Sequence, residues 1–173
     1  VRCKTGAAIA ALLENNFGIS REYMERRLST VFLNGQCIDD IDKQVVKNGG
    51  ILALSSAMPG LAGATLRRKG ALASMRSSIT GREDIRETEC IRDGFITVKL
   101  FNILAGELGP LFLARGIYVE TSRLADFLKA RGESFWSAVK DMLLNGQPVD
   151  SNGLIVALCR NSGGFILLTA SAA

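Results

Sequence analysis

The segment Phe32–Gln36 reads FLNGQ, and Leu143–Gln147 reads LLNGQ, so one chain of 173 residues carries nearly the same five letters twice. An Asn-Gly pair between apolar residues predicts a tight turn between two strands, because glycine adopts a positive φ without the steric cost of a Cβ. Five similar letters can arise by chance. The flanking residues therefore decide whether the repeat is structural.

The residues before the two turns also agree. Thr5–Phe17 (TGAAIAALLENNF) and Thr121–Arg131 (TSRLADFLKAR) each begin with a threonine suited to a helix N-cap. In both segments apolar residues then recur at helical spacing, which predicts a helix in each copy. These apolar residues are Ala8, Leu12 and Leu13 in the first copy and Leu124, Phe127 and Leu128 in the second.

The residues after the two turns agree as well. In the first copy Asn48, Gly49 and Gly50 precede ILALSSAMPG, and in the second Asn152 and Gly153 precede LIVALCRNSGG. Each copy is therefore predicted to run helix, strand, Asn-Gly turn, short element, second turn and strand. We interpret the chain as an internal duplication of one self-contained unit.

The second copy has an extension at its start that the first copy lacks. The ends of Phe95–Glu120, FITVKLF and GIYVE, predict two strands of a hairpin, and Gly106, Gly109 and Pro110 predict a loop between them. The first copy begins at Val1–Lys4 (VRCK), which occupies the position of IYVE. Its sheet edges therefore need a partner strand, from an upstream segment, from the other copy or from the mate in a homodimer.

The pattern ITVKLFNIL, GIYVE-TSRLADFL, MLLNGQPVD-SNGLIVAL and SGG resembles the ubiquitin-like β-grasp proteins of the sulfur-carrier group. That group includes the small subunit of molybdopterin synthase and the thiamine-pathway carrier. The resemblance covers nearly all of Phe95–Gly164 and, without the hairpin, Cys3 to about Gly63. It implies a first hairpin, a helix, a strand ending in an Asn-Gly turn, a last strand and a diglycine tail.

The family's reactive group is the carboxylate of a terminal glycine, which an adenylating enzyme activates. The resemblance places this role on Gly164, preceded by Gly163. Nine further residues, FILLTASAA, follow Gly164, so a carrier role requires proteolysis after it. The alternative interpretation is a glycine turn between two apolar strands.

We therefore predict an α+β protein of two β-grasp units. Residues 1–80 form the first unit, truncated at its start, residues 81–93 form a polar linker, and residues 94–173 form the second unit. No signal peptide is recognisable, so we expect a cytoplasmic protein. The most apolar stretch, Ile51–Leu66, contains Pro59 and is shorter than the roughly 20 residues of a membrane span, so no membrane contact is expected.

Catalytic chemistry finds little support in the sequence. The chain has no histidine, which excludes Ser-His-Asp and Cys-His nucleophile systems, and it has no Gly-x-Gly-x-x-Gly or Walker motif. Asp39, Asp40 and Asp42 do not have the spacing of a calcium loop and are interpreted as a polar turn. We expect no cofactor, no metal site and no enzymatic activity.

The four cysteines, at positions 3, 37, 90 and 159, form no Cys-x-x-Cys pair. They are interpreted as reduced and mostly buried thiols, and Cys159, in an apolar run, fits a buried position best.

The middle of the chain is basic, with Arg67, Arg68 and Lys69 followed by Arg76, Arg82 and Arg86. Such a run could follow a phosphate backbone, but the region between Phe32 and Phe95 has no aromatic residue on which bases could stack. Nucleic acid is therefore not the expected partner. The alternatives are a solvated linker and a protein with an acidic surface.

The sequence favours a non-enzymatic protein-binding module of ubiquitin-like fold, which uses a sheet face or an edge strand. The alternative is a sulfur-carrier or modifier precursor that is cleaved after Gly164. The candidate partner-binding residues are Trp136, a residue type enriched at interfaces but also suited to core packing, and the basic residues Arg67, Arg68 and Lys69.

Overall fold

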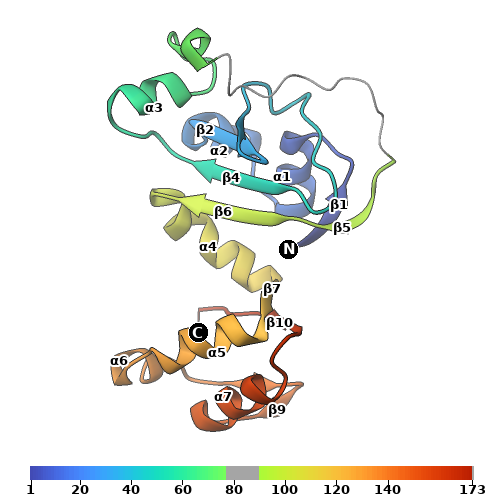
Figure 1. The fold of residues 1–173 in the computed structure, drawn as a ribbon, viewed down its shortest axis with the longest axis vertical. Coiled ribbons are helices and arrows are strands. Elements are labelled where there is room, and N and C mark those ends of the chain that lie inside the picture. The colour runs from blue at the N-terminus through green and yellow to red at the C-terminus, as the bar shows by residue number, and fades with distance from the viewer. Residues whose placement is uncertain (77–89, 173) are drawn as a thin grey trace. The chain divides into compact units, whose positions relative to one another are not determined.

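The computed structural model describes residues 1–76 and 90–172 and contains two compact units, Val1–Phe112 (unit 1) and Leu113–Ala173 (unit 2) (Figure 1). Both units combine helices with β-strands, which confirms the α+β class. No helix within these described ranges is long and apolar enough to cross a membrane.

Unit 1 alternates short strands with short helices. Its strands are β1 (Arg2–Thr5), β2 (Thr30–Leu33), β3 (Gln36–Cys37), β4 (Ile51–Ser55), β5 (Arg92–Phe95) and β6 (Thr97–Phe101). Its helices are α1 (Ile9–Phe17), α2 (Arg21–Arg27), α3 (Gly60–Leu66), the 3-10 helix Ala73–Arg76 and α4 (Ile103–Arg115), whose last turn belongs to unit 2.

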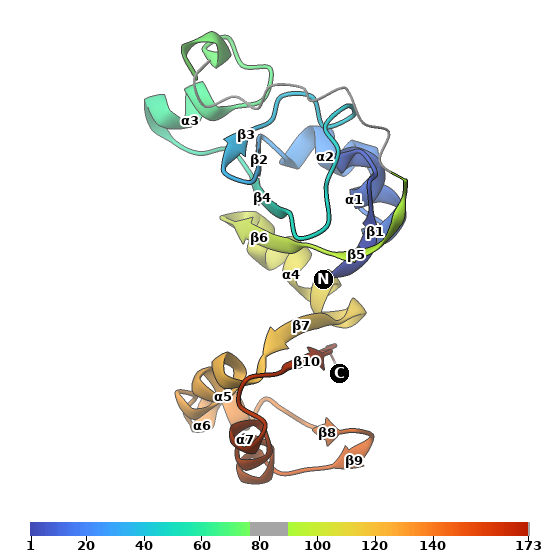
Figure 2. The same ribbon diagram turned by 45° about the vertical axis from the view of Figure 1, so that its right-hand side comes forward.

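A mixed sheet organises unit 1. β6 runs parallel to β4, β4 pairs antiparallel with β2, β2 with β3, and β1 with β5. Only Ile96 separates β5 from β6, and its amide and carbonyl both bond to Val1, at N···O distances of 3.0 and 2.7 Å. Arg92–Phe101 is therefore one continuous strand, and the order across the sheet is β1, β5–β6, β4, β2, β3 (Figures 1 and 2).

The core of unit 1 lies between this sheet and its helices. Alternate residues of the sheet point into the core, as the strand period requires. The buried residues of this layer are Val31, Leu33, Leu52 and Leu54 on the sheet and Ile9, Leu12, Leu13 and Phe17 on α1.

Helix α4 closes the core on the same side as α1 and α2. The Phe112 and Phe17 rings lie 4.8 Å apart between centroids, and the Tyr23 hydroxyl donates a hydrogen bond to Glu107 at 2.5 Å. Burial, followed by the neighbouring Glu107 carboxylate, raises the pKa of Tyr23, so its hydroxyl stays protonated as the donor.

Unit 2 is smaller and its sheet is less complete. Its elements are β7 (Ile117–Glu120), α5 (Thr121–Lys129), α6 (Glu133–Trp136), β8 (Leu143–Leu144), β9 (Gln147–Pro148), α7 (Ser151–Arg160) and β10 (Phe165–Leu168). β7 pairs antiparallel with β10, and β8 with β9, so two separate ribbons replace one sheet (Figure 2). The buried cluster is Leu124, Ala125, Leu128 and Leu158.

The two Asn-Gly turns have the same backbone geometry. Asn34 and Asn145 both have φ of 52°, and the glycines that follow, Gly35 and Gly146, have φ of 82° and 79°. Positive φ at both central residues is the conformation of a two-residue hairpin turn with right-handed strand twist. The predicted turns, β2–β3 and β8–β9, are confirmed.

Two segments differ in type from their prediction. The expected loop around Gly106 and Pro110 is helix α4, because Leu104, Leu108 and Phe112 recur at four-residue spacing and are buried together. The expected strand LIVAL is helix α7, because the side chain of Asp150 accepts a hydrogen bond from the Gly153 amide at 2.6 Å and caps it.

The threonines at the start of each copy are not helix N-caps. Thr5 ends β1, and its hydroxyl donates to the Arg92 carbonyl at 3.2 Å. The Thr121 hydroxyl donates to the Asn161 carbonyl at 2.8 Å. Each threonine is buried and ties its copy to a neighbouring backbone segment instead.

The units divide at a different place from the expected boundary at residue 94. β5, β6 and most of α4 belong to unit 1, because the strand Arg92–Phe101 pairs with β1 and β4. The strand Arg92–Phe101, which was predicted to belong to the second unit, therefore completes the sheet of unit 1. Of the predicted linker, residues 81–89 lie outside the described residues.

The cysteines divide into two groups. Cys3 and Cys37 are buried thiols, as predicted, whereas Cys90 and Cys159 are free and exposed. The expectation of a buried Cys159 is wrong, because helix α7 turns consecutive residues about 100° apart and directs Leu158, its neighbour, into the core.

We predict that Leu54→Ala lowers the free energy of unfolding of unit 1 by about 3 kcal/mol, because it leaves a cavity under a fully buried strand residue. Ile51→Ala on the same strand, where the side chain is 40% exposed, should cost less than about 1 kcal/mol. Urea unfolding followed by circular dichroism measures both, and equal costs would contradict the assigned sheet faces.

Candidate protein-binding face of unit 1

The central strand of unit 1 has apolar residues on both sides. Ile96 is buried, and Val98 and Leu100 alternate with it toward the core. The other side carries Phe95 and Phe101, which are 50% and 48% exposed. This second side of the sheet is a surface rather than a core.

Strand β4 extends this surface. Ile51 lies opposite Thr97, and Ala53 lies opposite Lys99, so the two strands present one set of side chains. We call Phe95, Lys99 and Phe101 of β5–β6, together with Ile51 of β4, the open face. It combines three exposed large apolar side chains with an exposed lysine.

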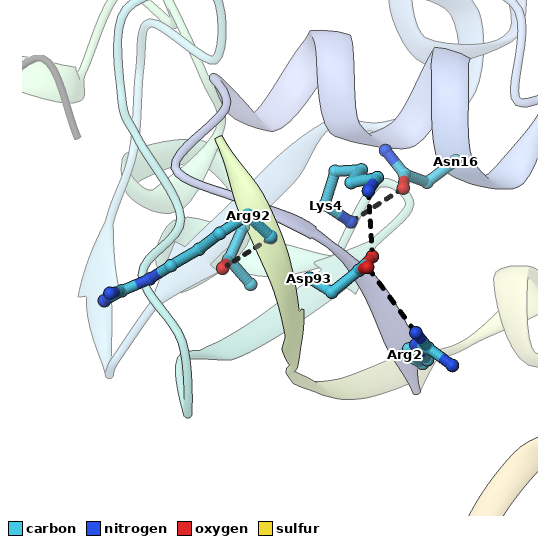
Figure 3. A network of polar contacts seen from close by, with 6 residues as sticks. Arg2, Lys4, Asn16, Arg92 and Asp93 are labelled. Atoms are coloured by element: carbon cyan, nitrogen blue, oxygen red, sulfur yellow. Dashed lines mark hydrogen bonds and ion pairs between the residues drawn. The ribbon is translucent and has the colours of Figure 1, made fainter. Parts of the chain in front are cut away.

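Charged side chains adjoin the open face on β1. Asp93 lies between two cations, with Lys4 Nζ 3.0 Å from Oδ1 and Arg2 Nη2 3.5 Å from Oδ2 (Figure 3). The hydrogen bond from Lys4, followed by the charges of Lys4 and Arg2, holds the pKa of Asp93 below its ordinary value. Among these side chains the three cations Arg2, Lys4 and Lys99 outnumber the carboxylate of Asp93, so the region stays net positive.

The outer edge of β1 is protected. The Lys4 amide donates to Asn16 Oδ1 of α1 at 2.8 Å, so this backbone donor is already used (Figure 3). The charged residues Arg2 and Lys4 further discourage pairing with another strand. At the opposite end of the sheet, β3 is only two residues long. The sheet therefore offers its face more readily than its edges.

The β2–β3 end of the same face is covered by the chain that follows β4. Cys37 Sγ lies 3.4 Å from the Leu66 carbonyl, and the Arg68 amide donates to the Ser29 carbonyl at 2.8 Å. Thr30 and Ser55 are buried accordingly. The accessible surface is confined to β4, β5 and β6.

The basic residues predicted from sequence do not form one exposed patch. Arg68 is half-buried, its Nε and Nη1 find no acceptor among the described residues, and burial lowers its pKa. The Lys69 backbone amide donates to Asp39 Oδ1 at 3.0 Å. Arg67 lines a separate pocket with Ser29 and Met58. Arg82 and Arg86 lie outside the described residues.

Small-molecule or metal sites have little structural basis in the described ranges. A pocket of about 170 Å³ adjoins Arg67, and one of about 60 Å³ lies between Arg21, Asp42 and Arg68, both below the roughly 300 Å³ of typical ligand sites. Residues 1–76 and 90–172 hold no cluster of three or more Cys, Asp or Glu suited to a metal.

The remaining predicted residues lie in unit 2, whereas Arg67, Arg68 and Lys69 lie in unit 1. Trp136 is half-buried against the Leu124–Leu158 cluster, and its ring stands edge-on to Phe135 at 5.2 Å. This contact supports the packing interpretation and leaves only part of the ring accessible.

Gly163 and Gly164 form the turn before β10. Gly163 has φ of 112°, and the Gly164 carbonyl accepts from the Thr121 amide at 3.0 Å. In the first copy Gly49 and Gly50 precede β4 in the same way. Gly163 and Gly164 therefore correspond in position to Gly49 and Gly50. The sequence had suggested Asn152 and Gly153 for this correspondence, but these two residues lie in helix α7.

The open face was not among the residues singled out from the sequence. FITVKLF was recognised as a strand, but it was assigned to the second copy. The available signal was its composition, since apolar residues occur at both odd and even positions and one face of a strand cannot hold both sets.

No family model matches the sequence, and no curated protein or solved structure is significantly similar to it. The chain's own residues therefore carry the functional argument.

The Asp93 site yields a prediction about pH. We expect Asp93 to titrate below the ordinary value of about 3.9, and Lys4→Met to raise its midpoint toward that value. Lys43→Met, which removes the partner of Asp40, should leave Asp93 unchanged. Carboxyl carbon NMR measures each midpoint.

The sign of the effect on stability follows from the lowered pKa. The interaction stabilises the folded protein fully above the unfolded pKa of the carboxyl, and it is lost as the pH falls through the lower folded pKa. Identical Asp93 midpoints in the native protein and Lys4→Met would refute the ion pair.

Proposed function

We propose that this chain is a non-enzymatic protein-binding module of ubiquitin-like β-grasp fold, and that it binds its partner on the open face of unit 1. The observation that carries the proposal is the exposure of Phe95 and Phe101 on a central strand whose opposite side lies in the core. Exposed aromatic residues grouped on a rigid sheet are typical anchors of protein interfaces.

The order of elements supports the β-grasp assignment. The antiparallel pair β5–β1 leads into α1, and then β2, the Asn-Gly turn, β3 and finally β4 follow. This order is similar to the hairpin, helix, turn and last strand expected of the sulfur-carrier group, except that the first hairpin strand lies later in the chain. An adenylating enzyme would be a partner only under the carrier alternative.

The charges around the open face favour an acidic protein surface. Arg2, Lys4 and Lys99 outnumber Asp93, so a complementary partner presents apolar residues flanked by carboxylates. Phe95 and Phe101 stand six residues apart on one strand, about 20 Å at 3.3 Å per residue. That spacing suits a protein interface rather than the stacking of adjacent bases.

A photo-cross-linking amino acid placed at Phe101 tests the proposal in the native cells. We expect one discrete protein adduct, identified by mass spectrometry, and none from the same probe at the exposed Glu22 of α2. Lys99→Glu should lower the adduct yield about tenfold, the effect of roughly 1.4 kcal/mol of lost binding energy.

Two outcomes would overturn this function. Equal adducts from Phe101 and Glu22 would remove the open face as a specific site. An adduct that nuclease digests would assign the surface to nucleic acid instead. Urea unfolding of the cross-linker variant, followed by circular dichroism before irradiation, verifies that unit 1 is folded.

The carrier alternative requires cleavage after Gly164, and this would remove β10 entirely. We predict that a chain ending at Gly164 loses the packed environment of Trp136, seen as a red-shifted emission. A control chain ending at Ala170 keeps β10 and the bond from Ala170 to the Leu113 carbonyl, and should keep the native emission. Native emission from the chain ending at Gly164 would support the carrier alternative.

A further inference from the structure

Unit 1 has a central strand that unit 2, as described, does not have between its corresponding strands. In unit 1, β5–β6 lies between β1 and β4 and pairs with both. In unit 2 the corresponding strands, β7 and β10, pair directly with each other, from Phe165–Glu120 to Leu168–Ile117. The two strands run antiparallel, as β1 and β4 do on either side of their shared neighbour.

The correspondence rests on several independent features. β7 precedes α5 as β1 precedes α1, and β10 follows a Gly-Gly turn as β4 does. The threonines also correspond, but their partners differ. Thr5 donates its hydroxyl to Arg92 of the central strand, whereas Thr121 donates to Asn161 and Gly164 beside β10. In unit 2, Thr121 thus bonds to the turn before β10, whereas Thr5 in unit 1 bonds to the central strand.

The core-facing residues of the two units also differ in burial. Leu52 and Leu54 of β4 are 0% exposed, whereas the equivalent residues of β10, Ile166 and Leu168, are only partly buried. Phe165 and Leu167, on the outer side of β10, are 69% and 53% exposed. In unit 1 the central strand supplies Ile96 to the core with Val98 and Leu100, and unit 2 has no such contribution from the residues described.

We propose that unit 2 is an acceptor for an added β-strand, which inserts between β7 and β10, antiparallel to the first and parallel to the second. The occupant is Arg92–Phe101, supplied by a second copy of this chain. The described residues hold one such strand and two units that could accept it, so within one copy the strand fills only one of the two positions. This inference concerns unit 2 and does not rest on the function proposed for unit 1.

The sequence of Arg92–Phe101 fits this role. Its core-facing residues, Ile96, Val98 and Leu100, would add to the aliphatic strand residues Val119, Ile166 and Leu168 that pack on the Leu124–Leu158 cluster. Strand addition of this kind obtains affinity from backbone hydrogen bonds and specificity from alternate side chains. β7 and β10 already run in the required directions. Insertion therefore exchanges their mutual hydrogen bonds for bonds to the added strand and moves the two strands apart by one strand spacing, about 4.8 Å.

A synthetic peptide with the sequence of Arg92–Asn102 tests the acceptor directly on the full chain. Trp136, the single tryptophan, lies in unit 2 and reports on it. We expect a saturable change in Trp136 fluorescence, a 1:1 complex in native mass spectrometry, and slowed amide exchange within Ile117–Glu120 and Phe165–Leu168. The matched control peptide carries Val98→Pro, which removes a backbone donor and should not bind.

A reversible block of the site provides the second test. Tyr118 and Leu167 lie directly opposite each other on the exposed side of the β7–β10 ribbon. Tyr118→Cys with Leu167→Cys, in a Cys90→Ser and Cys159→Ser background, allows a disulfide that holds β7 to β10. Oxidation should abolish peptide binding, and reduction should restore it, so a folding defect is distinguishable from closure of the site.

Three results would overturn the inference. They are no binding of the native peptide, equal binding of the Val98→Pro peptide, and slowed exchange at β1 and β4 in place of β7 and β10.

Discussion

The pairing of Arg92–Phe101 with β1 on one side and β4 on the other is the interaction on which unit 1 depends. Without it, β1 would be separated from the remaining strands, and the core would lose Ile96, Val98 and Leu100. The strand joins segments far apart in sequence, because β1 stands at residues 2–5 and β5 at residues 92–95. Such long-range pairing costs loop-closure entropy. This cost is offset only when the whole sheet assembles.

The same strand also determines the surface of unit 1. Its core side is aliphatic, whereas its other side alternates Phe95, Thr97, Lys99 and Phe101. A strand buried on one side is held rigidly, so the exposed aromatic rings have a fixed spacing. The sheet edges cannot serve a partner equally well, because Asn16 occupies the Lys4 amide and β3 ends after two residues. The binding function proposed here follows from this combination.

Local patterns predicted the Asn-Gly hairpins, the helices near Leu12 and Leu128, and the strands in FITVKLF and IYVE, because turn chemistry and periodicity act over few residues. The pairing partner of FITVKLF was not predictable in the same way, since alternation identifies a strand but not its neighbour. Gly106 and Pro110 suggested a loop, but burial of Leu104, Leu108 and Phe112 outweighed them. The open face depends on that pairing, so its residues also escaped the sequence analysis.

One strand that serves both core and surface links the two proposals energetically. A partner bound to Phe95 and Phe101 stabilises the strand in unit 1, because the open face exists only while the strand lies between β1 and β4. A strand donated to unit 2 by another copy must leave its own unit 1 and therefore gives up that copy's open face. Partner binding and strand exchange consequently oppose each other, and each weakens the other by the same factor. Under the two proposals, units 1 and 2 are alternative acceptors for one strand, and a partner bound to the open face biases which of them holds it.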